Sequence, residues 1–320
     1  MSDSWKIGSA EYDSALKKEA EYWGSEIKQA LQKGIPFSVD MRRAQKIFVH
    51  RGNGLPQQQS FDPKAEWIMN GELYERVFQW VRSVSPQARI LFLTCGGGGF
   101  CLELARQGHH VLGMDISHEA LQIAKNFADE NPYTKGFGSV EYKVTDLNRV
   151  ELPKDTFDVV MAWDGLHHIV ALDHLLHQIV KSLKPKGRFI FSDNIGMHRS
   201  SRLLGGGMYF LLPTHVSYAQ KWSIALRGAD AVKKEMQDRS PFEESHTHEM
   251  MPMVTRVFNI ERSFYHTSIG YRAAIAGDTR LPEKLKYPFL RFVKKLDDIL
   301  LKSGLFSPDH VLAMAYPIQK

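Results

Sequence analysis

The chain has 320 residues, 43% of them hydrophobic and 24% charged, which is typical of a globular protein with a large core. Its net charge of +5 is mildly basic and favours an ordinary solvated surface over attraction to nucleic acid or an anionic membrane. Two cysteines, Cys95 and Cys101, exclude a disulfide framework, predict small packing residues and fit a reducing cytoplasm. The polar N-terminus predicts no signal peptide, and the apolar runs are too short to cross a bilayer.

The first 88 residues predict helices and irregular chain. Helical spacing covers residues 9–34 and 62–84, with basic residues at 42–51 and a loop rich in Gly, Pro and Gln at 52–60. We interpret residues 1–88 as an N-terminal helical cap that packs on a main domain, residues 89–320.

Strands and helices alternate from residue 89 onward. The predicted strands are 90–94, 110–115, 140–144, 157–163 and 188–193, and the predicted helices are 99–107, 118–131 and 171–183. The strand segments are apolar on both faces, as buried parallel strands are, and helices supply the crossovers between them. The fold class is therefore α/β, a doubly wound and mostly parallel sheet that binds ligands at the carboxyl ends of its strands.

The alternation stops after the fifth strand. Residues 196–257 predict a helical lid insertion, and strand character returns at 257–267 and 311–317, which gives seven strands in all. A basic amphipathic helix is predicted at 282–304. Packing of its apolar face on the core explains this pattern, and contact with a membrane surface or a lipid-linked substrate is the alternative.

A glycine run, Thr94 to Gly99, joins the first strand to the first helix of this alternation. Glycine there lets a ligand approach the backbone, and the following helix directs its free N–H groups toward that ligand. Asp115 ends the second strand, 19 residues beyond Gly96, where an acid suits the hydroxyls of a ribose. The pattern predicts a nucleoside-containing cofactor.

The spacing of the run narrows the choice of cofactor. No GxxxxGK[ST] string occurs, which excludes a P-loop. A dinucleotide loop needs a small residue in the sixth position, where this chain has Cys101 or Leu102, so a nicotinamide-dependent dehydrogenase is disfavoured. S-adenosylmethionine needs exposed backbone for its carboxylate and ammonium but no pyrophosphate cradle, and it fits.

The segment Ile90 to Gly98, ILFLTCGGG, resembles the first motif of class I S-adenosylmethionine-dependent methyltransferases, roughly VLELGCGxG. Cys95 and two of the glycines match. Phe92 stands where the family has an acid that orients the methionine ammonium group, and Thr94 stands where it has a glycine, which suggests a wider first turn. The stretches HHVLGMDIS, VTDLNRVELPKDTFDVVMAWDGLHHI and LKPKGRFIFSDNIG resemble later motifs of the family in the right order.

The resemblance implies a Rossmann-like methyltransferase sheet with S-adenosyl-L-methionine as cofactor. It assigns the ribose to Asp115, packing on the adenine to Ile116, the adenine amine to Asp146 and the methionine end to Asp164. The full set of cofactor-binding residues that it implies is Thr94, Cys95, Gly96, Gly97, Gly98, Asp115, Ile116, Asp146, Leu147 and Asp164.

Two adjacent histidines follow the fourth strand, where methyl transfer takes place in the family. The ordinary interpretation is that one packs inward and the other caps the next helix. An imidazole there can also deprotonate an incoming hydroxyl or amine, and some family members place a catalytic histidine directly after the leucine. His167 and His168 are therefore the predicted catalytic residues. The spaced pairs at 174/177 and 246/248 lack a third ligand, so the sequence predicts no metal.

These patterns predict an S-adenosylmethionine-dependent methyltransferase acting on an oxygen or nitrogen of a small metabolite or saccharide-type acceptor. Two alternatives stay open: a nucleic-acid (RNA) methyltransferase, favoured by the basic residues at 42–51 and 284–302, and a non-catalytic S-adenosylmethionine-binding protein, favoured by Phe92 and Thr94. Neither the acceptor nor an oligomeric state follows from the sequence.

Overall fold

The computed structural model describes residues 5–32, 63–131, 135–196, 207, 210, 217–219, 221–222, 234–243, 245–266 and 281–318. The basic segment 42–51, the loop 52–60 and much of the predicted lid 196–257 lie outside these residues. Among the described helices, none combines the length and the apolar character that a membrane crossing requires.

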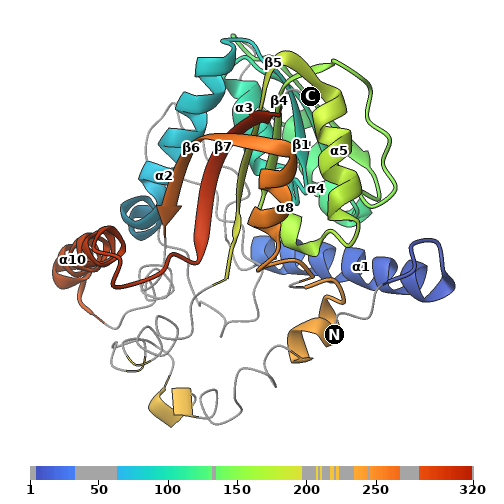
Figure 1. Cartoon of the computed structure of the whole chain (residues 1–320). Coiled ribbons are helices and arrows are strands. Elements are labelled where there is room, and N and C mark those ends of the chain that lie inside the picture. The colour runs from blue at the N-terminus through green and yellow to red at the C-terminus, as the bar shows by residue number, and fades with distance from the viewer. Residues whose placement is uncertain are drawn as a thin grey trace.

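Seven strands form one sheet in the order β3-β2-β1-β4-β5-β7-β6 (Figure 1). The first five pair in parallel, and β7 pairs antiparallel with both β5 and β6. This arrangement confirms the predicted fold class, including the two closing strands. The strands are β1 Arg89–Leu93, β2 His110–Asp115, β3 Ser139–Val144, β4 Phe157–Trp163, β5 Leu183–Asn194, β6 Phe258–His266 and β7 His310–Pro317.

The helices lie close to where the sequence predicts them. They are α1 Ala10–Gln32, α2 Pro63–Val84, α3 Gly99–Arg106, α4 His118–Asp129, α5 Leu172–Ser182, α8 Met250–Val257 and α10 Glu283–Lys302, with a short 3₁₀ turn, η2, at Leu166–His168. Most ends differ from the predicted ones by one or two residues. The exception is β5, which begins at Leu183 because Leu183 already pairs with Phe157 before a register shift.

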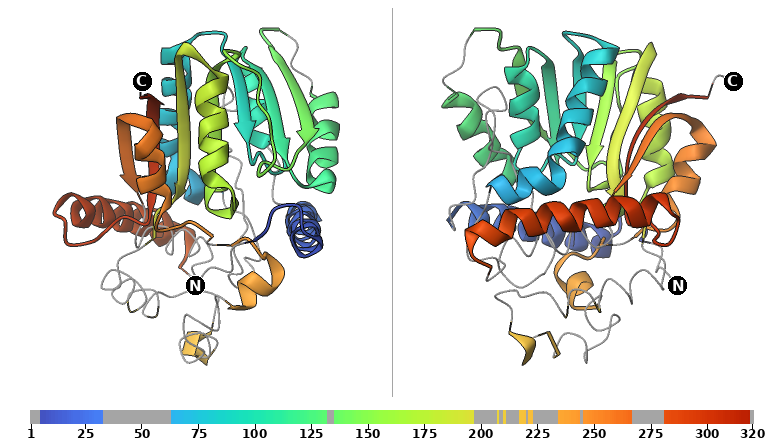
Figure 2. Two further views of the ribbon diagram at one scale, coloured as in Figure 1. Left: turned by 45° about the vertical axis from the view of Figure 1, so that its right-hand side comes forward. Right: turned by 90° about the vertical axis from the view of Figure 1, so that its left-hand side faces the viewer.

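Successive side chains of the central strand point to opposite faces of the sheet, as the strand period requires. Ile90 and Phe92 pack with residues of α2, α3 and α4, whereas Leu91 and Leu93 pack with residues of α5 and α8. Figure 2 shows helices on both faces of the sheet. The helix α2 of the predicted cap thus shares the core of the main sheet.

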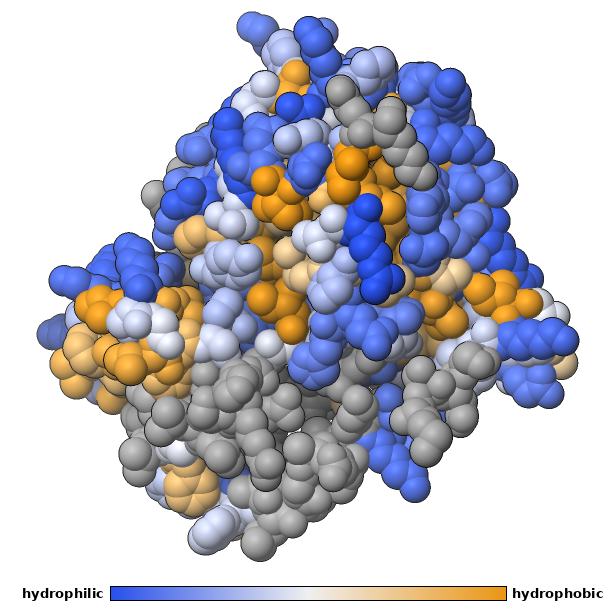
Figure 3. All heavy atoms as spheres, viewed as in Figure 1, coloured by the Kyte–Doolittle hydropathy of each residue, from blue (hydrophilic) through white to orange (hydrophobic). Residues whose placement is uncertain are grey.

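The long helix α10 packs beside α2 and β6. Its Leu290 is fully buried against Ala65 and Met69 of α2, which confirms that part of its apolar surface lies on the core. Leu285, Phe292 and Ile299 remain exposed, and Figure 3 shows apolar side chains on the outer face of this helix.

Helix α1 crosses below the carboxyl ends of the parallel strands and packs on α4 (Figures 1 and 2). That edge is where open α/β sheets bind ligands. Helix α1 therefore covers the ligand-binding edge of the sheet, and we call this cover the roof.

Candidate functional site

The glycine run forms a tight turn between β1 and α3. Thr94, Gly96 and Gly98 all have positive φ, at 51°, 51° and 74°. Glycine takes this conformation freely, whereas the Cβ of threonine makes it costly. Thr94 thus keeps the left-handed backbone that suits a glycine, and its hydroxyl donates a hydrogen bond of 2.6 Å to the carbonyl of Leu93.

Two glycines in the site are required by close packing. A Cβ on Gly98 would lie 2.6 Å from the ring of Tyr142 and 2.7 Å from Ala124. A Cβ on Gly165 would overlap the side chain of Thr94. Thr94 and Gly165 are therefore a matched pair, because the space that one side chain fills is left free by the other residue.

Asp115 ends β2 and braces the glycine turn. Its carboxylate accepts hydrogen bonds from the backbone N–H of Gly96 at 2.8 Å and of Ser117 at 3.0 Å. Burial raises the pKa of this carboxyl, and these backbone donors oppose the rise. Ser117 in turn caps α4 by accepting from the N–H of Ala120. Asp115 is thus held rigidly at the strand end with lone pairs left for a ligand.

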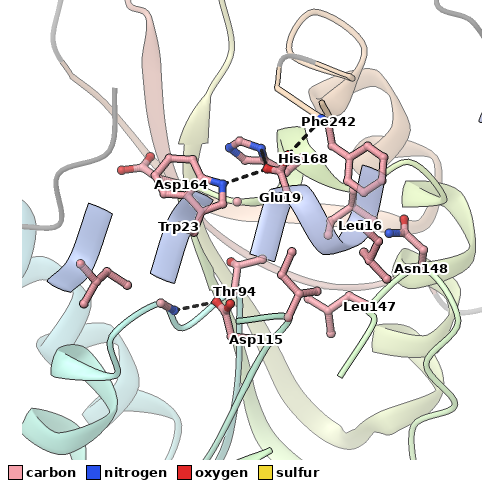
Figure 4. Close-up of a pocket in the computed structure, with 15 residues that line it drawn as sticks. Leu16, Glu19, Trp23, Thr94, Asp115, Leu147, Asn148, Asp164, His168 and Phe242 are labelled. Atoms are coloured by element: carbon pink, nitrogen blue, oxygen red, sulfur yellow. Dashed lines mark hydrogen bonds and ion pairs between the residues drawn. The ribbon is translucent and has the colours of Figure 1, made fainter. Parts of the chain in front are cut away.

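These strand ends open into a cavity that lies under α1 (Figure 4). The residues that line it are Leu16, Glu19, Trp23, Ile27, Thr94, Gly96, Asp115, Ile116, Leu147, Asn148, Asp164, Gly165, His168, Ile169 and Phe242. Three of these are acidic, and no lysine or arginine is among the described residues of the lining.

The roof of the cavity comes from one face of α1. The residues at 16, 19, 23 and 27 recur at helical spacing, so they share a face. Glu19 interrupts this apolar face and is buried. Its carboxylate accepts from Trp23 Nε1 at 2.8 Å, from the Ser240 hydroxyl at 2.7 Å and from the Phe242 N–H at 3.1 Å. Glu19 therefore ties the roof to the segment 240–243.

Asp146 follows β3 but does not line the cavity, although Leu147 and Asn148 do. Its two carboxylate oxygens accept from the Tyr12 hydroxyl at 3.0 and 2.9 Å. It also accepts from the Asn148 N–H at 2.9 Å and lies 3.2 Å from Arg149 Nε. Asp146 thus anchors the start of α1 and shapes the turn that presents the next two residues to the cavity.

Asp164 follows β4 with a φ of 44° and lines the cavity. Its Oδ1 atom is buried and has no hydrogen-bond partner among the described residues, and the nearest cation is His310 Nε2 at 3.8 Å. Burial raises the pKa of this carboxyl, partly opposed by the charge of His310. A buried unsatisfied carboxylate oxygen at a cavity wall is suited to a cationic ligand group.

His167 lies behind the cavity wall and does not line it. Its Nδ1 is 2.5 Å from Asp193 Oδ1, and Asp193 also accepts from the N–H groups of Gly165 and Leu166. Burial disfavours the charged imidazolium, but the adjacent Asp193 outweighs it and raises the pKa of His167 to about 9. Burial opposes the charge on Asp193 too, and His167 nevertheless lowers its pKa.

His168 does line the cavity. Its Nδ1 lies 3.0 Å from Glu19 Oε1, and its Nε2 lies 3.5 Å from Glu243 Oε2. The second oxygen of Glu243 is 3.8 Å from His167 Nε2. Burial works against ionisation of Glu19, but the contact with His168 keeps its pKa below the ordinary value. The two histidines predicted from the sequence are thus adjacent but face different surroundings.

The remaining predicted residues lie in the turn itself. Gly97 is buried, and Cys95 is a buried free thiol whose pKa is raised by burial. Phe92, which stands at the family's acidic position, is in the core beside Phe100 and does not reach the cavity. The contribution of Glu19 and Glu243 could not be read from local motifs. The one signal for Glu19 was a carboxylate on an otherwise apolar helix face.

The comparisons with known proteins agree with this geometry. Residues 91–191 match the family described as "Methyltransferase domain". This segment contains the glycine turn, Asp115, Asp164 and both histidines. Residues 91–191 are a class I S-adenosylmethionine-dependent methyltransferase domain.

Curated relatives of this methyltransferase domain include ubiquinone biosynthesis O-methyltransferases. The protein from Bradyrhizobium diazoefficiens is 32% identical over 104 residues, which are 32% of this chain and 39% of that protein. The mitochondrial protein from Schizosaccharomyces pombe is 34% identical over 104 residues, 32% of this chain and 37% of that protein. The chain thus spans less than half the length of each of these two relatives.

Solved structures of similar proteins include an S-adenosylmethionine-dependent methyltransferase from Mesorhizobium loti, with 20% identity, a TM-score of 0.44 and coverage of 78% of this chain and 97% of that one. Another is phosphoethanolamine N-methyltransferase 2 from Haemonchus contortus, in complex with S-adenosyl-L-methionine. It has 18% identity, a TM-score of 0.47 and coverage of 82% of this chain and 59% of that one.

Proposed function

We propose that the chain transfers a methyl group from S-adenosylmethionine to an oxygen or nitrogen of a small-molecule acceptor. The observation that carries this proposal is the charge of the cavity. Asp115, Asp164 and Glu19 line an otherwise largely apolar space without a lysine or arginine among the described lining residues. Such a cavity attracts the sulfonium and ammonium cations of S-adenosylmethionine and repels phosphates.

The cofactor is placed along the strand ends in this proposal. Asp115 accepts from the ribose hydroxyls, and the adenine packs between Ile116 and Leu147. The methionine end lies over the backbone of residues 94–98 and reaches Asp164. The buried oxygen of Asp164 that lacks a hydrogen-bond partner then receives the ammonium group, which replaces the acid missing at Phe92.

Asp146 acts indirectly in this arrangement. Its carboxylate already receives hydrogen bonds from Tyr12 and from the Asn148 N–H. We therefore assign to Asp146 the positioning of residues 147 and 148 against the adenine, in place of the direct contact with the adenine amine that the resemblance implies.

The acceptor is placed on the other side of the cavity, between the apolar roof residues of α1, Phe242 and His168. The curated relatives are O-methyltransferases, which supports an oxygen as the methyl acceptor. His168 contacts the acceptor, and His167 is a positioning residue that holds its neighbour through the rigid Asp193 pair. The acceptor attacks the methyl carbon in line, and the C–S bond breaks with its electron pair returning to sulfur.

The protein contributes mainly orientation and the exclusion of water. The roof helix α1 covers the reacting groups, and the backbone at Gly96 and Gly98 lets the sulfonium lie close to the strand ends. The acidic cavity and the O-methyltransferase relatives favour a small acceptor over a polynucleotide, whose phosphates it would repel.

We also propose that residues 1–88 act as a cap and that 196–257 act as a lid, from which Phe242 lines the cavity. Residues 282–304 would support the cap through α2. Two buried free thiols, Cys95 and Cys101, support a reducing compartment such as the cytoplasm.

The test is a turnover assay with methyl-labelled S-adenosylmethionine and a panel of small phenols, alcohols, amines and saccharides. We expect release of S-adenosylhomocysteine with at least one acceptor. The substitution His168→Ala should lower turnover about 10²-fold through loss of acceptor alignment and leave cofactor affinity unchanged. His177→Ala, on the exposed side of α5, is the control. Cofactor binding without turnover across the panel would instead support a non-catalytic binding protein.

A further inference from the structure

Two imidazoles face one carboxylate at the wall of the cavity. His167 Nε2 lies 3.8 Å from Glu243 Oε1, and His168 Nε2 lies 3.5 Å from Glu243 Oε2. One ligand atom from each of the three residues falls within 4.8 Å of the others. These three residues, His167, His168 and Glu243, are called the His-His-Glu cluster below.

The two histidine–glutamate separations are close to those of ligands around a small metal ion. They exceed the ~2.7–3.2 Å of an N–H···O hydrogen bond. Zinc bonds of ~2.0–2.2 Å to nitrogen and oxygen in a tetrahedral arrangement place neighbouring ligand atoms about 3.4 Å apart. The measured 3.5 and 3.8 Å are close to this value, so small adjustments of the side chains suffice to hold an ion.

His167 is oriented as a metal ligand is, and a carboxylate also lies next to His168. The Nδ1 of His167 hydrogen-bonds to Asp193 at 2.5 Å, whereas the Nδ1 of His168 lies 3.0 Å from Glu19 but has no hydrogen-bond partner among the described residues. A carboxylate on one ring nitrogen fixes the ring and leaves the other nitrogen's lone pair for the metal. Both Nε2 atoms are thereby directed toward Glu243.

The orienting carboxylates are themselves held in place. Asp193 accepts from the backbone N–H groups of Gly165, Leu166 and Asn194. Glu19 accepts from Trp23, Ser240 and Phe242. A ligand set supported in this way is preorganised, and little rearrangement is needed for an ion to bind.

The charge of the surroundings favours a cation. Three carboxylates face two imidazoles, and the side chains of Asp193 and Glu19 are at most 2% exposed. Negative charge therefore exceeds positive charge even when both imidazoles are protonated. A divalent ion balances these buried carboxylates and leaves both imidazoles neutral, which is their ligating form.

We propose that the His-His-Glu cluster binds one divalent transition-metal ion of the zinc class, with its open coordination position toward the cavity. Two imidazoles and one carboxylate are a ligand set of catalytic zinc sites and of non-haem iron sites, whereas Mg²⁺ and Ca²⁺ prefer oxygen ligands. The sequence predicted no metal here because Glu243 is remote along the chain from the two histidines, so no spacing pattern includes it.

A role for the ion in catalysis rests on the proposed function. His168 lines the cavity, so an ion on its Nε2 lies at the acceptor side. A divalent ion lowers the pKa of a hydroxyl that it contacts. The acceptor proton then passes to water, the acceptor oxygen attacks the methyl carbon, and the electrons of the C–S bond return to sulfur.

The test uses the full chain, stripped with a chelator and dialysed against ZnCl₂ or CoCl₂, with bound metal measured by elemental analysis. We expect one ion per chain. The substitution Glu243→Gln removes a ligand with little change of shape, and Glu19→Gln weakens the orientation of His168. The ligand substitution should reduce affinity at least as much as the ~10–100-fold typical of orienting residues.

A matched control is Asp173→Asn, which alters an exposed pair in which His177 Nδ1 lies 3.5 Å from a carboxylate without a third ligand. Metal affinity should not change in this variant. Equal affinities of Glu243→Gln and the wild type, or no stoichiometric binding at all, would overturn the proposal. S-adenosylmethionine binding, measured on the same samples, separates this failure from a failure of the proposed function, because Glu243 does not line the cofactor cavity.

Discussion

The two walls of the cavity differ in the sequence separation between the residues that form them. The sheet wall, from Thr94 to Asp115, consists of neighbouring strand ends and one short turn. The roof consists of α1 and residues 240–243, joined through Glu19. The first wall is organised by local backbone geometry, whereas the second depends on buried polar contacts between distant segments. In the proposed function, the first wall binds the cofactor and the second wall contacts the acceptor.

The largest loss of stability is expected when the contacts between α1 and residues 240–243 are removed. Glu19→Ala removes the acceptor of three hydrogen bonds and the carboxylate that lies 3.0 Å from His168 Nδ1. Removing one member of a buried ionic network costs about 3–5 kcal/mol. Urea unfolding should show this loss. Glu21→Ala, an exposed position on the same helix, should change stability very little, and equal effects of the two substitutions would contradict the role given to Glu19.

The sheet wall carries its own charged contact, which pH can break. His310 lies 3.0 Å from Asp309 and 3.8 Å from Asp164, and the ring of His266 lies beside it, tilted by 33°. Burial disfavours the charge of His310, but the carboxylates of Asp309, Asp164 and Asp193 raise its pKa to about 9. Because this pKa is above the unfolded value of about 6.5, the contribution is fully present below about pH 6.5 and is lost as pH rises through 9.

His310→Gln should remove that pH-dependent contribution. At 1.36 kcal/mol per pKa unit, the contribution is about 3 kcal/mol at most. Urea unfolding of the wild type and the variant at about pH 6 and about pH 10 measures it. The stability difference between the two proteins should shrink toward the higher pH. Because both proteins are compared at the same pH, the effects of other groups that titrate there cancel. A difference that stays constant with pH would show that His310 is uncharged in the folded protein.

The close packing of Thr94 against Gly165 gives a further prediction, for the stability of the sheet wall. Gly165→Ala places a Cβ on the Thr94 side chain and should cost about 1–3 kcal/mol through overpacking. Thr94→Gly alone should be milder, since the left-handed backbone suits glycine. The double variant should recover most of the loss in a thermal unfolding cycle. Additive effects would mean that the two residues do not share this space.

The smallest loss of stability is expected near the start of α1. Tyr12→Phe removes the hydroxyl that binds both oxygens of Asp146. Asp146 keeps its contacts with Asn148 and Arg149, so the loss should be about 1 kcal/mol in unfolding experiments. Cofactor affinity should fall only slightly. A loss as large as that of Glu19→Ala would show that Asp146 is the main anchor of α1.

The sequence predicted the sheet wall in detail because its signals are local. Buried parallel strands appear as apolar runs, and the glycine turn and Asp115 have a fixed spacing. The seven strands and the two closing strands at 257–267 and 311–317 were predicted and are confirmed, whereas the strand order is known from the structure alone. The early start of β5 was missed because pairing with Phe157, a tertiary contact, extends the strand through a segment that reads as a turn.

The roof and the cluster behind it could not be predicted in the same way. Glu19 and Glu243 reach the histidines from segments far away in the sequence, and burial alone distinguishes Glu19 from the other acids of α1. The different surroundings of His167 and His168 are likewise set by which carboxylate each ring meets. Adjacent identical residues carry no sequence signal that tells one from the other.

The most direct test of the account is calorimetric titration of the full chain with S-adenosylmethionine and with S-adenosylhomocysteine. We predict that one molecule binds per chain and that Asp115→Ala weakens binding by about 1–3 kcal/mol, the scale of lost hydrogen bonds to a charged group. Thermal unfolding of the Asp115→Ala variant checks that the protein still folds. Binding of neither ligand to the wild-type protein would contradict the central claim that this cavity holds the cofactor.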